Sequence, residues 1–217
     1  MKKIIYCFLL AGLFANSLSA QVTLGVKSFY NTAWQQYSED LLILRQDVYI
    51  HNFGGGLTFQ YAIDEHLSIG IEPGFVQRGA ACLPGFNLPI GGIEATLVGN
   101  YIEAPLTLEG HLFAWQERVQ FFAKAGAGYS YMIGGYRQID FQNPEVPAER
   151  TNLDFSQEPN LNRFDFGFYG SGGFGVKAGP GYITAECRYY HGMPNVDKNQ
   201  ESRNRAISYG LGYRVTL

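Results

Sequence analysis

A serine and a histidine in the first third of the sequence could together carry out acyl transfer. Ser28 lies in the segment 22–30 and His51 in the segment 49–61, and both segments alternate apolar residues with small or polar ones. If a hairpin pairs Tyr30 with Tyr49, Ser28 lies directly opposite His51. A histidine beside a serine hydroxyl can accept its proton and so activate it as a nucleophile. An acyl hydrolase also needs a carboxylate that orients the histidine, and hydrogen-bond donors for the oxyanion. No spacing selects a carboxylate from those in the adjoining connection, Glu39, Asp40 and Asp47.

A larger set of ionisable side chains lies within such alternating segments. Six basic and five acidic residues occupy the positions opposite in parity to the apolar ones. Charges shut inside a protein persist only when they are paired or hydrogen-bonded, and this near balance of signs suits a paired network. The predicted network consists of Lys27, Glu72, Arg78, Glu103, Glu109, Lys124, Asp165, Lys177, Glu186, Arg188 and Arg214.

The N-terminal residues are typical of an export signal. Lys2 and Lys3 precede an apolar run over 4–15, and the following Ser-Leu-Ser-Ala fits a small-x-small cleavage pattern. The run is shorter than the roughly 20 residues that span a bilayer as a helix. We therefore predict a signal peptide over 1–20 and one mature domain over 21–217. That domain keeps 14 lysines and arginines against 19 aspartates and glutamates, a net charge of −5.

The mature domain offers little other chemistry. Its two cysteines, Cys82 and Cys187, are predicted to be free thiols, and no cysteine and histidine spacing resembles a zinc site. The glycine-rich run at 54–56 has neither the lysine nor the helix of a phosphate-binding loop. No basic cluster suits nucleic acid. We therefore expect no cofactor, no metal, no nucleic-acid partner and no enzymatic activity.

Alternating segments recur along the whole chain and predict an all-β fold. Their lengths, mostly 9–15 residues, suit tilted membrane-spanning strands better than soluble strands, which average about 5–6. The eight segments are 22–30, 49–61, 67–79, 99–111, 119–133, 164–178, 182–191 and about 204–217.

The connections between these segments alternate in length. Three are short, at 62–66, 112–118 and 179–181, and four are long, at 31–48, 80–98, 134–163 and 192–203. Bacterial outer-membrane barrels have short periplasmic turns and long external loops. The connection 134–163 is polar and contains prolines, so we expect it to be exposed and partly disordered.

The direction of the apolar face separates two barrel types. In a secreted soluble barrel it would surround an apolar ligand, whereas in an outer-membrane barrel it meets lipid and the charges fill the narrow interior. Continuous apolar faces, strand length and tyrosines and phenylalanines near the segment ends favour lipid. We predict an eight-stranded antiparallel up-and-down transmembrane β-barrel in the cell outer membrane, with outer-membrane lipid and the barrel-assembly machinery as partners. Gly212, Val215 and Leu217 fit a terminal signal read by that machinery.

Four runs add a family resemblance. The sequences IEPGFVQRGA, NYIEAPLTLEG, AKAGAGYSYMIGG and AECRYYHGMPNV resemble strands of the PorT-like outer-membrane β-barrel domain family of Bacteroidota. This resemblance extends over essentially all of 21–217. It implies a membrane barrel and allows an accessory role in envelope export.

Three functional hypotheses remain. The favoured one is a structural or interaction role through the external loops, which would bind an unknown protein or surface ligand, or the accessory export role. The second is a lipid-modifying acyl hydrolase that uses Ser28 and His51 on the lipid-facing side. The third is the secreted soluble barrel that binds an apolar ligand.

Overall fold

The computed structural model describes residues 22–37, 45–84, 93–116, 118–141 and 145–217, so the predicted signal peptide lies outside the described residues. The strands in this part of the chain are β1 (Val22–Tyr37), β2 (Arg45–Val48), β3 (Ile50–Ala62), β4 (Leu67–Ile71), β5 (Gly74–Pro84), β6 (Ile93–Ala114), β7 (Val119–Phe141), β8 (Glu149–Asn152), β9 (Phe164–Ala178), β10 (Gly181–Asp197) and β11 (Gln200–Thr216). No helix in the described ranges is long and apolar enough to cross a membrane.

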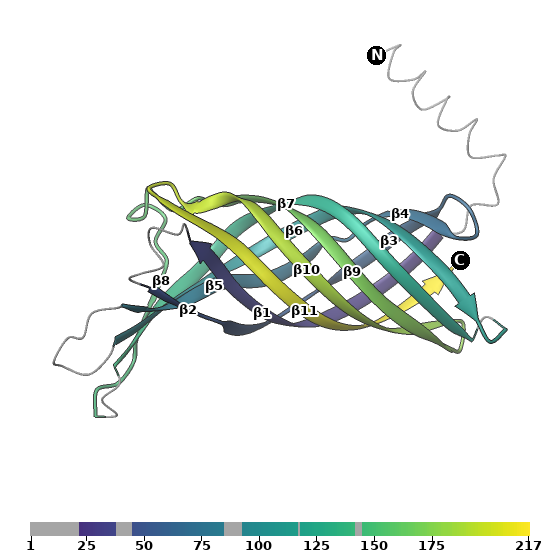
Figure 1. Ribbon diagram of the computed structural model, residues 1–217, viewed down its shortest axis with the longest axis horizontal. Helices are drawn as coiled ribbons and strands as arrows, with labels where there is room; N and C mark the ends of the chain where they lie inside the picture. Colours follow the sequence, from purple (N-terminus) through teal and green to yellow (C-terminus); the bar gives the residue numbers. More distant parts are fainter. Residues whose placement is uncertain (1–21, 38–44, 85–92, 117, 142–144) are drawn as a thin grey trace, which may run out of the picture.

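The strands close into a tilted barrel (Figure 1). Each barrel strand pairs antiparallel with its neighbours, and β1 pairs with β11 from Thr23–Thr216 to Tyr37–Ser202, which closes the ring. β4 and β5 are two pieces of one barrel strand, since both lie between β3 and β6. The ring therefore has eight strands, and the predicted fold is confirmed.

Alternate side chains of the barrel strands point outward and inward. On β6, Leu106 is 61% exposed, whereas Glu109 is 1% exposed. Phe121, Tyr129 and Leu211 likewise lie on the outside, while the buried set is rich in charged and amide side chains. The secreted soluble barrel, with its apolar face inward, is therefore the wrong interpretation.

Two prolines interrupt the sheet at the same level. Pro73 separates β4 from β5, and Pro105 lies on the adjacent strand β6, where Ile71 pairs with Leu106 and Gly74 with Glu103. Proline has no N–H to donate to a ladder, so the two missing donors fall in one irregular patch. Across this patch the Glu72 N–H donates to the Pro105 carbonyl at 3.0 Å, and on the other side the Leu57 N–H donates to the Pro73 carbonyl at 2.9 Å. The break is occupied by Glu72, whose side chain enters the barrel.

At the end of the barrel opposite the C-terminus, the strands extend beyond the predicted segments (Figure 1). β1 continues to Tyr37, β5 to Pro84 and β7 to Phe141, and the short strands β2 and β8 pair with β5 and β7. The turns at the other end are short, and the turn after β3 is held by Asp64 Oδ1, which accepts from the N–H groups of His66 and Leu67. Because long connections face outward in such barrels, the end that carries β2 and β8 is the outer one.

Part of the connection 134–163 folds back over the outer mouth of the barrel. Leu153, Phe155 and Leu161 pack against the buried cluster of Val76, Tyr101 and Met132. The prediction of a loop that is exposed and partly disordered is therefore wrong for this part, because apolar residues spaced among the polar ones provide a buried face. We call residues 153–163 the outer cap.

Polar contacts fasten the outer cap to the rim. The Arg163 guanidinium stacks on the rings of Phe155 and Tyr131, at 4.0 and 4.6 Å from their centroids. Asn162 donates from its backbone N–H to the Val196 carbonyl at 2.8 Å. Within the cap, the Ser156 hydroxyl and N–H donate to Asp154 and lower the pKa of that carboxyl group.

Candidate functional site: the charged lumen

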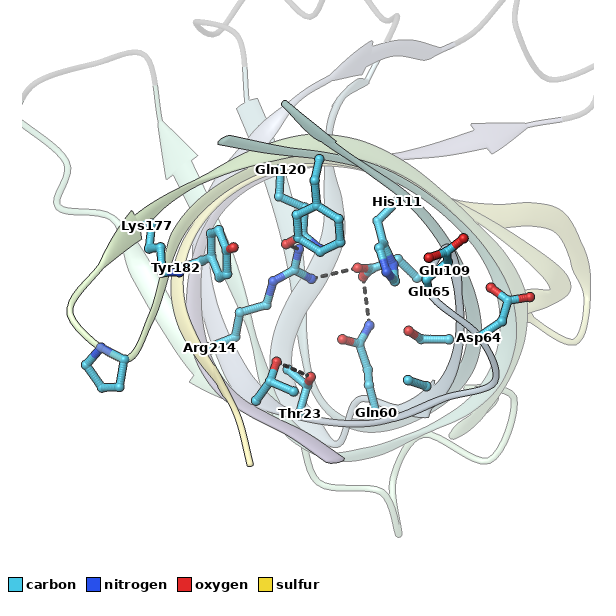
Figure 2. A pocket seen from close by; sticks show the side chains of 15 residues that line it. Thr23, Gln60, Asp64, Glu65, Glu109, His111, Gln120, Lys177, Tyr182 and Arg214 are labelled. Atoms are coloured by element: carbon cyan, nitrogen blue, oxygen red, sulfur yellow. Dashed lines mark hydrogen bonds and ion pairs between the residues drawn. The ribbon is translucent and has the colours of Figure 1, made fainter. Parts of the chain in front are cut away.

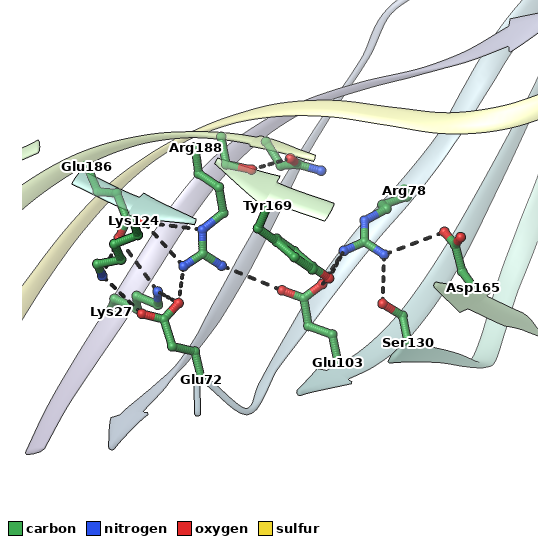
Figure 3. A network of polar contacts seen from close by, with 12 residues as sticks. Lys27, Glu72, Arg78, Glu103, Lys124, Ser130, Asp165, Tyr169, Glu186 and Arg188 are labelled. Atoms are coloured by element: carbon green, nitrogen blue, oxygen red, sulfur yellow. Dashed lines mark hydrogen bonds and ion pairs between the residues drawn. The ribbon is translucent and has the colours of Figure 1, made fainter. Parts of the chain in front are cut away.

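The middle of the lumen is organised around Glu72, which enters from the break between β4 and β5 (Figure 3). Its carboxylate accepts from Lys27 at 2.5 Å, from Lys124 at 3.0 Å and from Arg188. Glu186 faces the same three cations, at 3.6, 3.5 and 3.2 Å. The two carboxylates and three cations come from four different barrel strands, with Glu186 and Arg188 both on β10, so this cluster connects the wall across its interior.

A second cluster lies on the outer side of the first. Arg78 pairs with Glu103, donates to Ser130 Oγ at 3.0 Å and lies 3.8 Å from Asp165. The Tyr169 hydroxyl donates to Glu103 at 3.1 Å (Figure 3).

Two further contacts hold this second cluster in place. The Arg78 guanidinium stacks on the Tyr190 ring, 3.7 Å from its centroid. Arg188 approaches Glu103 at 3.8 Å, which links the second cluster to the first. The two clusters therefore form one continuous network.

The periplasmic end of the network is built on Glu109. Its carboxylate accepts from Arg214 at 2.7 Å and Gln60 at 2.7 Å, and Lys124 lies at 3.3 Å (Figure 2). Arg214 also donates to Gln120. Below these residues a polar recess of about 370 Å³ opens at the barrel end, lined among others by Asp64, Glu65, His111, Lys177 and Tyr182.

The buried charges balance. Ten of the eleven predicted residues, five basic and five acidic, have side chains that are at most 8% exposed, and each lies within 4 Å of an opposite charge. Removing one partner of a buried pair costs about 3–5 kcal/mol, because a charge is left without compensation. We therefore expect the loss of a single lumen charge to destabilise this barrel.

A model of the outer membrane protein beta-barrel domain matches residues 14–198. The chain belongs to this family. The outer membrane protein beta-barrel domain family places it in the outer membrane, in agreement with its apolar outer face. A comparison with curated proteins finds no match.

Several solved outer-membrane barrels are similar in shape to this family member. Ail of Yersinia pestis, solved with the heparin analogue sucrose octasulfate, is 13% identical, with 89% of this chain and 99% of that chain covered and a TM-score of 0.41. Neisserial surface protein A is 12% identical, with 88% and 96% covered and a TM-score of 0.43. OprG of Pseudomonas aeruginosa is 11% identical, with 90% and 95% covered and a TM-score of 0.49.

Lys177 differs from the other predicted network residues. It lines the periplasmic recess, its side chain is exposed, and among the described residues it forms no ion pair within 4 Å. β9 ends at Ala178, so the side chain of Lys177 reaches water beyond the barrel wall. Its assignment to the buried network is therefore wrong.

The structure does not bring Ser28 and His51 together. Tyr30 pairs with Phe53 and not with Tyr49, so Ser28 lies opposite Gly55 and His51 opposite Thr32. The assumed register is wrong by four residues because β1 continues past Tyr30. An even shift keeps both side chains on the lipid-facing side but separates them along the strands.

His51 instead belongs to an aromatic surface. It stacks on Tyr30, with ring centroids 5.6 Å apart and planes 10° from parallel, and its Nδ1 lies 3.3 Å from the Thr32 hydroxyl. Glu39 and Asp40 lie outside the described residues, and so does the side chain of Asp47. The acyl-hydrolase hypothesis thus loses the contact on which it rested.

The polar partners of the network were missed in the sequence because they carry no charge. Gln60, Gln120 and Ser130 lie at the same inward-facing alternate positions as the ionisable residues. Those positions in the sequence could have identified them as lumen residues. Tyr169 and Tyr190 are also inward and buried. Cys187 is an exposed free thiol on the lipid-facing side, whereas the side chain of Cys82 lies outside the described residues. No group of three metal-ligating side chains occurs in the part of the chain that the structure describes.

Proposed function

We propose that this protein is a closed outer-membrane barrel that acts through its outer surface and not as a channel or an enzyme. The charged network supports the proposal most directly, since it fills the lumen from the outer cluster at Arg78 to the periplasmic cluster at Glu109. Eight strands leave an interior just wide enough for side chains. Outer-membrane lipid covers the apolar face in this proposal, and the barrel-assembly machinery inserts the exported chain.

The filled lumen predicts that the barrel conducts no ions. Purified protein reconstituted in planar bilayers should give no conductance steps, because Arg78, Glu103 and the apolar cluster under the outer cap leave no continuous water path. A large porin reconstituted in the same bilayers serves as the positive control. Reproducible steps that scale with protein concentration would contradict the closed barrel.

The outer surface offers a place for a partner. β8 is exposed along its whole length, and it lies beside the outer cap, which Glu158 fastens to Arg137 of β7 through a 3.0 Å ion pair. This exposed, polar surface above the membrane suits an unknown protein or surface ligand. An accessory role in envelope export, as the PorT-like motifs suggest, would instead engage the periplasmic turns.

Site-specific photo-crosslinking in living cells tests this proposal and separates its two forms. A crosslinking amino acid at Thr151 of β8 should give a defined adduct if the outer surface binds a partner, and one at the exposed Glu65 should do so for an export apparatus. The lipid-facing Ala125 is the matched control and should give no protein adduct. Absence of adducts from both Thr151 and Glu65 would overturn the interaction role.

A further inference from the structure

Two arginines continue the lipid-facing row of β11 at its outer end. Arg203 and Arg205 share the outward parity of Ile207, Tyr209 and Leu211, and the register between β11 and β1 is unbroken over this region. On the neighbouring strand β10, His191 lies directly opposite Arg205. Arg203 and Arg205 therefore supply the positive charge of one patch that also includes the His191 ring, and we call this patch the outer arginine face.

The outer arginine face lies at the level of the lipid headgroups. Eleven residues of β11 separate Arg205 from Thr216 at the periplasmic end, which corresponds to about 36 Å along the strand. With a tilt of about 40°, the height above the periplasmic end is about 28 Å, close to the apolar band of about 25 Å in such barrels. On β10 the outward-facing side chain likewise changes from the aromatic Tyr189 to the polar His191 at the boundary between the apolar band and the headgroups.

In the part of the chain that the structure describes, no carboxylate lies within 4 Å of Arg203 or Arg205. Arg203 and Arg205 are close enough to repel each other, and both repel a proton on His191. Among the described residues neither arginine forms an ion pair within 4 Å, although Glu201 precedes Arg203 by two positions on the same strand. Asp165 attracts Arg205 from the lumen side of the wall, but its ion pair is with Arg78.

Other arginines at the outer rim do have partners. Arg137 pairs with Glu158, and Arg163 stacks on the outer cap. Within the described residues, Arg203 and Arg205 thus have neither a carboxylate within 4 Å nor the aromatic stacking that holds Arg163. An anion from outside the protein would neutralise them.

Aromatic rings surround the buried member of this face. Arg205 is 4% exposed, and its Nη1 donates to the carbonyls of Gly192 at 2.6 Å and Asn204 at 2.9 Å. Trp34 of β1 and Tyr189 of β10 lie on the two strands that flank β11, with ring centroids 6.4 Å apart. Arg205 is therefore a fixed charge, while the exposed Arg203 and the half-buried His191 are free to donate to a ligand.

We propose that the outer arginine face binds the phosphate group of an outer-leaflet glycolipid. Guanidinium groups match phosphate oxygens in geometry and charge. The rings of Trp34, Tyr49 and Tyr189 provide an amphipathic surface of the kind found at membrane interfaces, against which the sugar and the first acyl carbons would pack. A glycolipid would thus contact both the guanidinium groups and the aromatic rings, whereas free phosphate could contact only the guanidinium groups.

Titration of the full-length refolded barrel in detergent, followed by native mass spectrometry, tests the proposal. Wild-type protein should bind bisphosphorylated lipid A at least tenfold more tightly than the same lipid with its phosphates removed. Arg203→Gln should weaken binding of the phosphorylated lipid about tenfold, the effect of losing one charge-assisted hydrogen bond. Arg137→Gln, a rim arginine that already has an acidic partner, should leave binding unchanged.

Three results would overturn the proposal. They are equal affinity for the two lipids, unchanged binding by Arg203→Gln, and competition by inorganic phosphate at the concentration of the lipid, which would indicate a site for free phosphate. Arg203 is exposed and outside the lumen network, so its replacement should not affect folding. The comparison of the two lipids uses the wild-type protein and needs no variant.

Discussion

Replacing Glu72 with glutamine should lower the free energy of unfolding by about 3–5 kcal/mol, the usual cost of removing one partner of a buried ion pair. Glutamine keeps the size of the side chain but removes the charge that Lys27, Lys124 and Arg188 share. Glu186 is then the one described carboxylate within 4 Å of all three cations, while Glu109 still lies near Lys124 and Glu103 near Arg188. The narrow lumen of an eight-stranded barrel has no room for water to replace the lost carboxylate.

Urea unfolding in lipid vesicles measures this effect. The sequence has two tryptophans, Trp34 at the outer girdle and Trp115 in the turn between β6 and β7, which report on the two ends of the barrel. Heat-modifiable migration in gels gives an independent measure of the folded fraction. Glu72→Gln with the stability of the wild type would show that the network contributes nothing to folding.

Two further variants make the Glu72 test specific. Lys177→Met also removes a charge, but at the exposed mouth of the barrel, and should change stability by less than about 0.5 kcal/mol. Adding Lys27→Met to Glu72→Gln removes a cation that would otherwise share Glu186 with Lys124 and Arg188, and should recover part of the loss. Recovery in the double variant would attribute the effect to charge and not to packing.

The alternation of apolar and polar residues in the sequence predicts most of the barrel strands and most of the side chains that fill the lumen. Alternation alone places Lys27, Glu103 and Arg214 inside, because a strand has a fixed period of two. Alternation cannot predict which carboxylate meets which cation, since that depends on the stagger between strands that are far apart in the chain. The pairing of Arg214 with Glu109 joins β11 to β6 across the lumen and has no local signal.

The errors in the prediction have a common physical origin. The predicted register of the β1–β3 hairpin was wrong by four residues because the connection contains no residues that specify a tight turn. The alternation could not reveal this error, since an even shift leaves the apolar residues on the same face. The fold of the outer cap depends on the Val76, Tyr101 and Met132 cluster, whose members come from three separate strands. Parity within a strand is encoded locally, whereas register and loop packing are decided by contacts between distant segments.

Gly79→Ala should destabilise the barrel by at least about 3 kcal/mol or prevent its assembly, because the backbone at this position does not tolerate a side chain. Gly79 has a φ of +155°, and a Cβ there would lie 1.8 Å from the Leu97 carbonyl oxygen of β6. Only separation of β5 from β6 could relieve this contact. That separation would also displace Arg78, which precedes Gly79 and anchors the outer cluster of the network.

Gly170→Ala is the matched control for this variant. Gly170 lies in β9 on the exposed outer side, and a Cβ there would meet nothing within 4 Å. Alanine restricts the unfolded chain more than glycine does, so this variant should equal or exceed the wild type in stability. Similar urea midpoints for Gly79→Ala and Gly170→Ala would contradict the close approach of β5 to β6. A loss confined to Gly79→Ala would show that the outer half of the wall depends on backbone contact as strictly as the lumen depends on charge balance.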